Sequence, residues 1–192
     1  MVRDQKVVTV FGSGSAPEGS DECESAARLG QALAAHGLAV CNGGYGGTML
    51  AAARAAHEAD AHTIGVTLGS AGWGPANPFI RREISCTSLA ERIMTLLEMG
   101  DGYVVLPGGT GTLAEIGLLL ELLNKGMMKP APVVFLGDHW QPLLSLLRGE
   151  GLFHGAPPYA ASEGIEMLGR IAWASDPESA AAFLAANLGT GT

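Results

Sequence analysis

Residues 103 to 115 combine the residue types with the clearest chemical potential in this chain. An apolar run, Tyr103–Leu106, leads into Pro-Gly-Gly-Thr-Gly-Thr and then into a helical pattern that contains Glu115. Glycines let a backbone approach a ligand closely, and the free N–H groups at a helix start favour an anion. A carboxylate beside a phosphate is unfavourable unless positive charge intervenes. Glu115, expected on the first turn, therefore indicates chemistry next to a phosphate more than binding of it.

Two further glycine-rich loops follow apolar runs. Gly12-Ser13-Gly14-Ser15 offers small side chains and hydroxyls, but it lacks the third glycine of a dinucleotide fingerprint, so a plain turn and a ligand contact are equally compatible with it. The loop from Asn42 to Met49 has four glycines in five positions. Four glycines cost more backbone entropy than a turn requires, so the pattern favours a function for this loop.

The expected ligand-binding residues come from these three loops. They are Gly12, Ser13, Gly43, Gly44, Gly46, Gly47, Thr48, Met49, Gly108, Gly109, Thr110, Gly111 and Thr112. The Walker sequence and the G-x-S-x-G elbow are absent, which disfavours the common NTPase and α/β-hydrolase classes. Residues 109–114 match a loose dinucleotide pattern, but they follow a late strand, so NAD is disfavoured as well. A small phosphorylated ligand is the class that remains.

Short β-branched runs alternate with alanine- and leucine-rich helical patterns along the chain. We expect strands at Val7–Phe11, Leu38–Cys41, Thr63–Leu68, Tyr103–Leu106, Val133–Leu136 and Arg170–Trp173, and helices at Asp21–Ala35, Thr48–Glu58, Leu89–Met99, Thr112–Lys125, Trp140–Arg148 and Pro177–Ala186. The alternation predicts a Rossmann-like, doubly wound α/β fold, with a mostly parallel sheet and helices on both faces. Ligands bind such sheets at the carboxyl ends of the strands, where the glycine loops fall. The stretch Gly69–Phe79 is predicted to be an irregular loop or lid.

Length and composition narrow the class of protein. At 192 residues the chain suits one domain, predicted as 1–188 with a disordered tail at 189–192. No apolar run approaches the roughly 20 residues of a membrane helix, and the amino terminus lacks the features of a signal peptide, so we expect a soluble, cytoplasmic protein. A net charge of -8 without a basic run disfavours a nucleic-acid surface.

Metal and disulfide chemistry find little support in the sequence. Cys23, Cys41 and Cys86 are scattered, which predicts buried, reduced thiols rather than a disulfide framework or a zinc site. The five histidines form no ligand spacing either. Arg92 lies on an amphipathic helix, and its spacing alone favours a solvated charge paired with Glu91 or Glu98.

The segment from Pro107 to Glu115 resembles the P-G-G-x-G-T-x-x-E motif of the LOG family, formerly described as lysine decarboxylase-like. The resemblance extends to the Phe-Gly-Ser-Gly loop, to the Gly-Gly-Tyr-Gly-Gly-Thr-Met loop and to an arginine 15 residues before the motif proline, which here is Arg92. The order of these features along the chain also resembles their order in the enzymes of this family. They usually have Arg-Lys where this chain has Arg92-Ile93, and often a glutamate at the position of Ala114.

This resemblance implies a function. Characterised family enzymes are phosphoribohydrolases that cleave cytokinin riboside 5′-monophosphates, or AMP, into free base and ribose 5-phosphate. The resemblance implies Arg92 and Glu115 as the catalytic pair, no metal or redox cofactor, and a homodimer formed partly by the helix after the motif. Residues 73–79 and 121–125 are similar to a bacterial side branch described only as nucleotide-binding, which itself resembles a molybdenum-cofactor carrier that binds without hydrolysing. A non-catalytic carrier is therefore the alternative.

Overall fold

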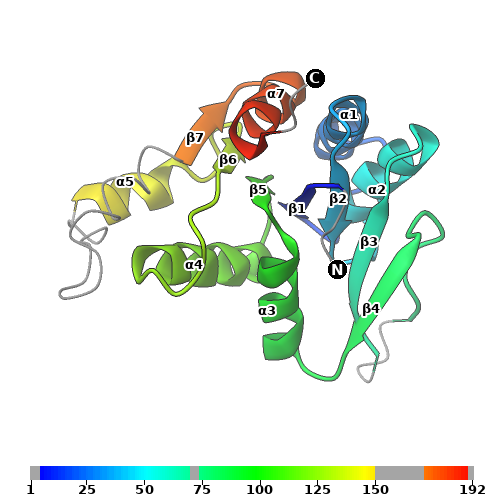
Figure 1. Ribbon diagram of the computed structural model, residues 1–192, viewed down its shortest axis with the longest axis horizontal. Helices are drawn as coiled ribbons and strands as arrows, with labels where there is room; N and C mark the ends of the chain where they lie inside the picture. The colour runs from blue at the N-terminus through cyan, green and yellow to red at the C-terminus, as the bar shows by residue number, and fades with distance from the viewer. Residues whose placement is uncertain (1–4, 70–73, 150–170, 190–192) are drawn as a thin grey trace.

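A single parallel sheet organises the chain, whose computed structural model describes residues 5–69, 74–149 and 171–189. Its strands lie in the order β4-β3-β2-β1-β5-β6-β7 (Figure 1). The strands are β1 Val7–Phe11, β2 Ala39–Asn42, β3 Thr63–Leu68, β4 Arg82–Cys86, β5 Gly102–Val105, β6 Val133–Leu136 and β7 Ile171–Ala174. The helices are α1 Asp21–Ala35, α2 Thr48–Glu58, α3 Leu89–Met99, α4 Thr110–Asn124, α5 Gln141–Gly149 and α7 Pro177–Leu188.

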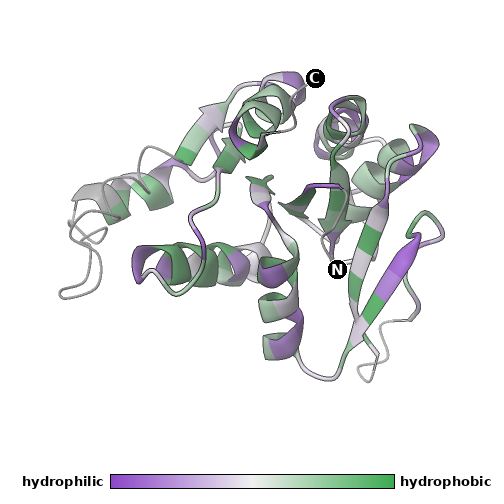
Figure 2. Cartoon of the chain, viewed as in Figure 1, coloured by the Kyte–Doolittle hydropathy of each residue, from purple (hydrophilic) through white to green (hydrophobic). Residues whose placement is uncertain are grey.

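Helices cover both faces of the sheet. Side chains of α1, α2 and α7 pack with one set of strand residues, and those of α3, α4 and α5 pack with the alternate set (Figures 1 and 2). Strands buried on both faces are apolar at nearly every position, which is why their sequences read as continuous β-branched runs. The predicted doubly wound α/β fold is confirmed. The boundaries proposed for the domain remain a prediction, and residues 190–192 of the predicted tail lie outside the described residues.

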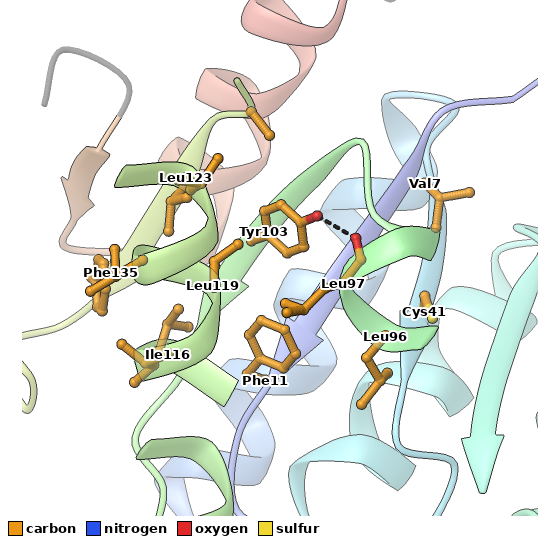
Figure 3. Close-up of a cluster of buried hydrophobic side chains, with 14 of the residues drawn as sticks. Val7, Phe11, Cys41, Leu96, Leu97, Tyr103, Ile116, Leu119, Leu123 and Phe135 are labelled. Carbon is orange, nitrogen blue, oxygen red and sulfur yellow. Dashed lines mark hydrogen bonds between the residues drawn. The ribbon is translucent and has the colours of Figure 1, made fainter. Parts of the chain in front are cut away.

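The register of the central strands determines where the loops emerge. β1 pairs in parallel with β5, with Phe11 opposite Val105, and with β2 on its other side. Phe11 and Tyr103 stack beneath this junction with ring centroids 6.0 Å apart, and the Tyr103 hydroxyl donates a 2.5 Å hydrogen bond to the Leu97 carbonyl (Figure 3). A buried hydroxyl that is satisfied in this way fixes its ring, and hence α3 against the sheet. The loops after β1, β2 and β5 therefore leave one edge of the sheet as neighbours.

One strand, β4, was missed by the sequence prediction. It lies at the edge of the sheet and pairs only with β3 among the described strands, and its ribbon is strongly hydrophilic (Figure 2). Ile84 and Cys86 turn inward, while Arg82, Glu83 and Ser85 are exposed. The period-two alternation was present in the sequence, but the polar content of an exposed edge strand masked it.

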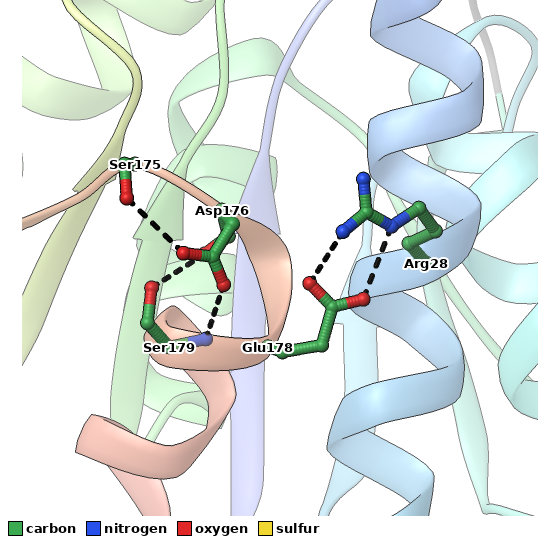
Figure 4. A network of polar contacts seen from close by, with 5 residues as sticks. All are labelled: Arg28, Ser175, Asp176, Glu178 and Ser179. Carbon is green, nitrogen blue, oxygen red and sulfur yellow. Dashed lines mark hydrogen bonds and ion pairs between the residues drawn. The ribbon is translucent and has the colours of Figure 1, made fainter.

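Local signals account for most helix ends. Asp176 caps α7 by accepting from the Ser179 N–H at 2.8 Å, and Glu178 on the same turn forms a paired contact with Arg28 of α1 (Figure 4). The pair is exposed, so we assign it little stabilisation beyond orienting α7 on α1.

No helix among the described residues is long and apolar enough to cross a membrane. The described part of the predicted loop, Gly69 and residues 74–79, contains neither helix nor strand.

Gly117→Ala is expected to stabilise the protein. Gly117 is exposed within α4, and a Cβ there would meet no atom within 4 Å. Alanine in a helix interior is favoured over glycine by up to about 1 kcal/mol, so the urea midpoint should rise. Gly30→Ala in α1 is the control with the opposite sign, because its Cβ would collide with the Ala52 carbonyl. A lower urea midpoint for Gly117→Ala would contradict the expectation that a methyl group at this helix position is accommodated without strain.

Candidate active site

Three loops meet at the carboxyl edge of the sheet, as their predicted positions require. The Thr48 hydroxyl, at the start of α2, donates to the Ser13 carbonyl at 3.1 Å, and the Thr48 N–H donates to the same oxygen at 2.9 Å. From the other side, the Thr112 hydroxyl donates to the Gly12 carbonyl at 3.1 Å. The loop after β1 is therefore held between the other two, as expected for a central strand.

These contacts occupy the side-chain hydroxyls of two predicted phosphate ligands, Thr48 and Thr112. Thr48 and Thr112 are 1% and 3% exposed, and both hydroxyls are used in hydrogen bonds to backbone carbonyls. Their side chains join the loops and do not present free donors at the surface. Gly47 also allows these loops to meet, because its φ is +61° and a Cβ there would collide with the Ser13 carbonyl. Glycine is required at this position by both backbone conformation and space.

Other predicted ligand residues leave open space above them. Gly109 and Gly111 are exposed, and a Cβ at either position would meet no protein atom within 4 Å. Neither has a positive φ. Packing and backbone conformation therefore do not require glycine there, and what the missing side chains provide is room over the start of α4. Thr110 between them and Gly46 of the second loop are exposed as well.

The helices that begin at this junction lack side-chain caps. Gly47 precedes α2 and Gly109 precedes α4, and neither supplies a capping hydrogen bond. In contrast, Ser20, Ser88 and Asp176 cap α1, α3 and α7 with their side chains. The first N–H groups of a helix have no intrahelical partner and carry partial positive charge. Two uncapped helix starts at one edge of the sheet are suited to an anion.

Arg92 is buried, so the solvated charge that its spacing favoured is wrong. It is 9% exposed, its Nε donates to the Val66 carbonyl at 2.7 Å, and one Nη donates to the Gly43 carbonyl at 3.1 Å. The guanidinium lies 5.6 Å from the centroid of the Tyr45 ring. A Cβ at Gly43 would overlap the guanidinium, so a larger residue there would displace Arg92 from this position. Arg92 therefore brings a buried positive charge against the glycine loop.

Glu115 lies in the second turn of α4, because the helix begins at Thr110, two residues earlier than predicted. The side chain is 8% exposed. Burial raises the pKa of Glu115 to about 7 and outweighs the opposite effect of the nearby Arg92 charge. None of the ion pairs in the described part of the chain joins Glu115 to Arg92. A buried carboxyl that titrates near neutrality beside an arginine is typical of a site that moves protons.

Two asparagines that the prediction did not single out shape the second loop. Asn42, fully buried at the end of β2, accepts from the Gly44 N–H at 2.8 Å and donates to the Met49 carbonyl at 3.0 Å. Asn77 donates to the carbonyls of Gly44 and Tyr45. The only sequence signal for Asn77 is the Asn-Pro pair, which favours a turn and indicates nothing about a distant loop.

The remaining predictions have mixed outcomes. Met49 is half-buried, and its side chain lies close to Gly43 and Gly14, beneath the loops. The three cysteines are buried thiols, as predicted. No group of three His, Cys, Asp or Glu residues in the described ranges is placed to hold a metal ion.

A cavity of about 370 Å³ borders Gly47 on the α1 side, and the ion pair of Glu18 and Arg54 forms part of its lining.

Comparison with known proteins gives a family and a fold. Residues 5–131 match the SLOG cluster4 family. Over 135 residues, 65% of this chain and 52% of the relative, the sequence is 28% identical to LOGL2 of Oryza sativa subsp. japonica, a probable cytokinin riboside 5′-monophosphate phosphoribohydrolase. The match thus spans about half the length of that curated relative. It confirms the resemblance to the LOG family that the motif indicated.

Solved structures of similar fold include two molybdenum-cofactor proteins. The molybdenum cofactor carrier protein of Chlamydomonas reinhardtii aligns over 96% of this chain and 99% of its own, with a TM-score of 0.72 and 23% identity. The molybdenum cofactor binding protein of Rippkaea orientalis aligns over 94% of each chain, with a TM-score of 0.67 and 24% identity. At these identities the likeness establishes the fold.

Proposed function

This chain belongs to the SLOG cluster4 family, and on that premise we propose that it is a nucleoside 5′-monophosphate phosphoribohydrolase. The substrate class is AMP or a cytokinin-type nucleotide, and the products are the free base and ribose 5-phosphate. One observation carries the proposal: a buried carboxyl, Glu115, whose pKa lies near neutrality, stands one turn beyond an uncapped helix start with open space above its glycines.

The phosphate is assigned to the start of α4. Backbone N–H groups from Gly109 to Thr112 provide donors in an open position, and the exposed Gly46 backbone faces the same edge of the sheet. Holding the phosphate fixes the sugar relative to Glu115. The Thr48 and Thr112 hydroxyls already donate hydrogen bonds to backbone carbonyls, so backbone N–H groups are the donors assigned to the phosphate.

Glu115 is assigned the chemical step. Water adds to C1′ as the N-glycosidic bond breaks, and the bonding electron pair leaves with the base, which takes up a proton. Ionised Glu115 accepts the proton of the attacking water and offsets the positive charge that develops at C1′. The positive charge of Arg92 lowers the pKa of Glu115, and so raises the ionised fraction at neutral pH, and it offsets repulsion between the carboxylate and the phosphate.

A carrier without turnover is the second candidate, and a specific observation favours it. Arg92 uses its Nε and one Nη on backbone carbonyls and makes no ion pair with Glu115 in the described structure, so the catalytic pair is not joined directly. The two molybdenum-cofactor proteins also align with nearly the whole chain. The same loops would then hold a nucleotide or a pterin phosphate without cleaving it.

Self-association through α4 accompanies the proposal. Much of the α4 ribbon is hydrophobic in Figure 2, and Leu113 on the helix and Met127 just after it are 42% and 73% exposed. A helix that is apolar all round is normally covered. A homodimer in which a second copy covers α4 is the arrangement we propose.

Chromatography after incubation with a panel of nucleoside 5′-monophosphates tests the function. We expect free base and ribose 5-phosphate to be released from at least one member, which identifies the base. Lack of release across the panel would refute the hydrolase. An absorbance spectrum of the purified protein then distinguishes the carrier, because a retained pterin or nucleotide absorbs beyond what 3 tryptophans and 3 tyrosines explain.

A further inference from the structure

The outer bend of the glycine loop is held by a segment distant in sequence. The Asn77 side chain donates from Nδ2 to the Gly44 carbonyl at 3.1 Å and to the Tyr45 carbonyl at 3.0 Å. The Asn77 N–H donates to the same Gly44 carbonyl at 2.7 Å. One residue thus satisfies the carbonyls at the point where the loop reverses, and Gly44 itself has a φ of +76°. A backbone of glycines has little conformational preference of its own, so its shape depends on such contacts.

The segment that carries Asn77 is itself anchored to the sheet. The Phe79 carbonyl accepts from the Thr63 hydroxyl at 2.6 Å and lies 3.1 Å from Nδ1 of His57 on α2. The Arg81 N–H donates to the Thr63 carbonyl at 3.1 Å. The Asn77 Oδ1 accepts from the Phe79 N–H at 3.2 Å, which fixes the orientation of the amide. Asn77 is therefore held in place by β3 and α2, independently of the glycine loop.

Close packing at Gly65 brings the two segments together. A Cβ at Gly65 in β3 would lie 3.0 Å from the Ile80 side chain and 3.1 Å from the Gly44 Cα. A larger residue would separate the Asn77 segment from the loop. The glycine in the middle of β3 has this close approach as its physical reason.

The contact between Asn77 and the loop also bears on Arg92, because Tyr45 contacts both residues. The carbonyl of Tyr45 is bound by Asn77, its hydroxyl accepts from the Leu68 N–H at 2.7 Å, and its ring covers the Arg92 guanidinium. Arg92 in turn donates to the Gly43 carbonyl, one residue before the Asn77 contact. Both sides of the bend are thus held, one by the arginine and one by the asparagine.

We infer that Asn77 is a positioning residue: it holds the glycine loop in the conformation in which the Gly46 backbone faces the ligand's phosphate at the start of α4. The inference rests on the proposed function, since it takes the ligand to be a nucleotide. Asn77 touches no reacting atom and acts through the backbone of Gly44 and Tyr45. Its loss is therefore expected to weaken binding more than it slows turnover at saturation.

Asn77→Asp isolates the two side-chain donors. The aspartate keeps an oxygen for the Phe79 N–H, but it cannot donate to the two carbonyls. Asn187→Asp is the matched control, because the exposed Asn187 of α7 also donates to a carbonyl, that of Phe183 at 2.8 Å. Asn77→Ala, which adds no charge, is the second variant. Each protein is measured for the melting temperature, for hydrogen exchange of peptides covering residues 42–49, and for AMP dissociation and KM.

For both Asn77 variants we expect faster exchange in residues 42–49 and an AMP dissociation constant and KM raised about ten-fold, the size of two lost neutral hydrogen bonds. The change in kcat should be smaller than that in KM, and Asn187→Asp should match the wild type. Unchanged exchange, or faster exchange with unaltered AMP affinity, would overturn the inference. If the wild type binds no nucleotide of the panel, the proposed function fails, and exchange alone decides whether Asn77 holds the loop.

Discussion

Glu115→Gln is expected to lower the rate of base release by roughly 10²–10⁴-fold while leaving AMP binding close to that of the wild type. Glutamine has nearly the same shape as glutamate, but it neither accepts the proton of the attacking water nor carries the negative charge that offsets an oxocarbenium-like C1′. In the proposed function the phosphate is bound by the backbone at the start of α4, one turn before Glu115, so we expect the variant to keep its affinity for the substrate.

The measurement is single-turnover release of free base with protein in excess, alongside AMP affinity by calorimetry. Glu121→Gln is the control, because Glu121 lies on the same helix but is exposed and pairs with Lys125 at 3.7 Å. It should retain the full rate. Turnover by Glu115→Gln at the wild-type rate would remove Glu115 from the mechanism. A parallel loss of affinity would place the carboxyl in ligand binding.

The same substitution is expected to stabilise the protein at alkaline pH. Burial raises the pKa of Glu115 from 4.5 to about 7, so the unfolded chain loses this proton at a lower pH than the folded one. Stability associated with the neutral carboxyl is fully present below about pH 4.5 and is lost as the pH rises through about 7, at up to about 1.4 kcal/mol per pH unit. Glutamine is neutral throughout and escapes this loss.

The free energy of unfolding of Glu115→Gln should therefore exceed that of the wild type by roughly 3 kcal/mol at about pH 8, as an upper bound from the pKa difference. The gap should close toward about pH 5. Urea titrations across that range, with Glu121→Gln in parallel, provide the measurement. A gap independent of pH would show that the Glu115 carboxyl does not titrate near neutrality in the folded protein.

Both expectations for Glu115 describe one physical situation. The carboxyl costs stability when it is ionised, because its burial shields it from water, and this burial also brings its pKa to the range where it exchanges protons readily. A stabilised but inactive Glu115→Gln protein is thus the combined result expected of a hydrolase. In a carrier, the substitution would stabilise the protein with no activity to lose.

The strands and helices were largely predictable because their patterns are local. Buried parallel strands read as continuous apolar runs, and helix starts carry Ser20, Ser88 and Asp176, whose side chains do cap them. The edge strand β4 was not predicted, because its exposed positions carry polar residues and so its sequence contains no continuous apolar run.

The sequence by itself determined the fold class, the three glycine loops and the family motif with Glu115, because each is written in consecutive residues. Only the tertiary structure decided that Arg92 is buried against Gly43 and that Asn77 donates to the Gly44 carbonyl from 33 residues away. It also decided that Thr48 and Thr112 join loops. The physical reason is that burial, a shifted pKa and the partner of a hydrogen bond depend on what the sheet brings alongside a residue, and a local pattern does not contain that neighbour.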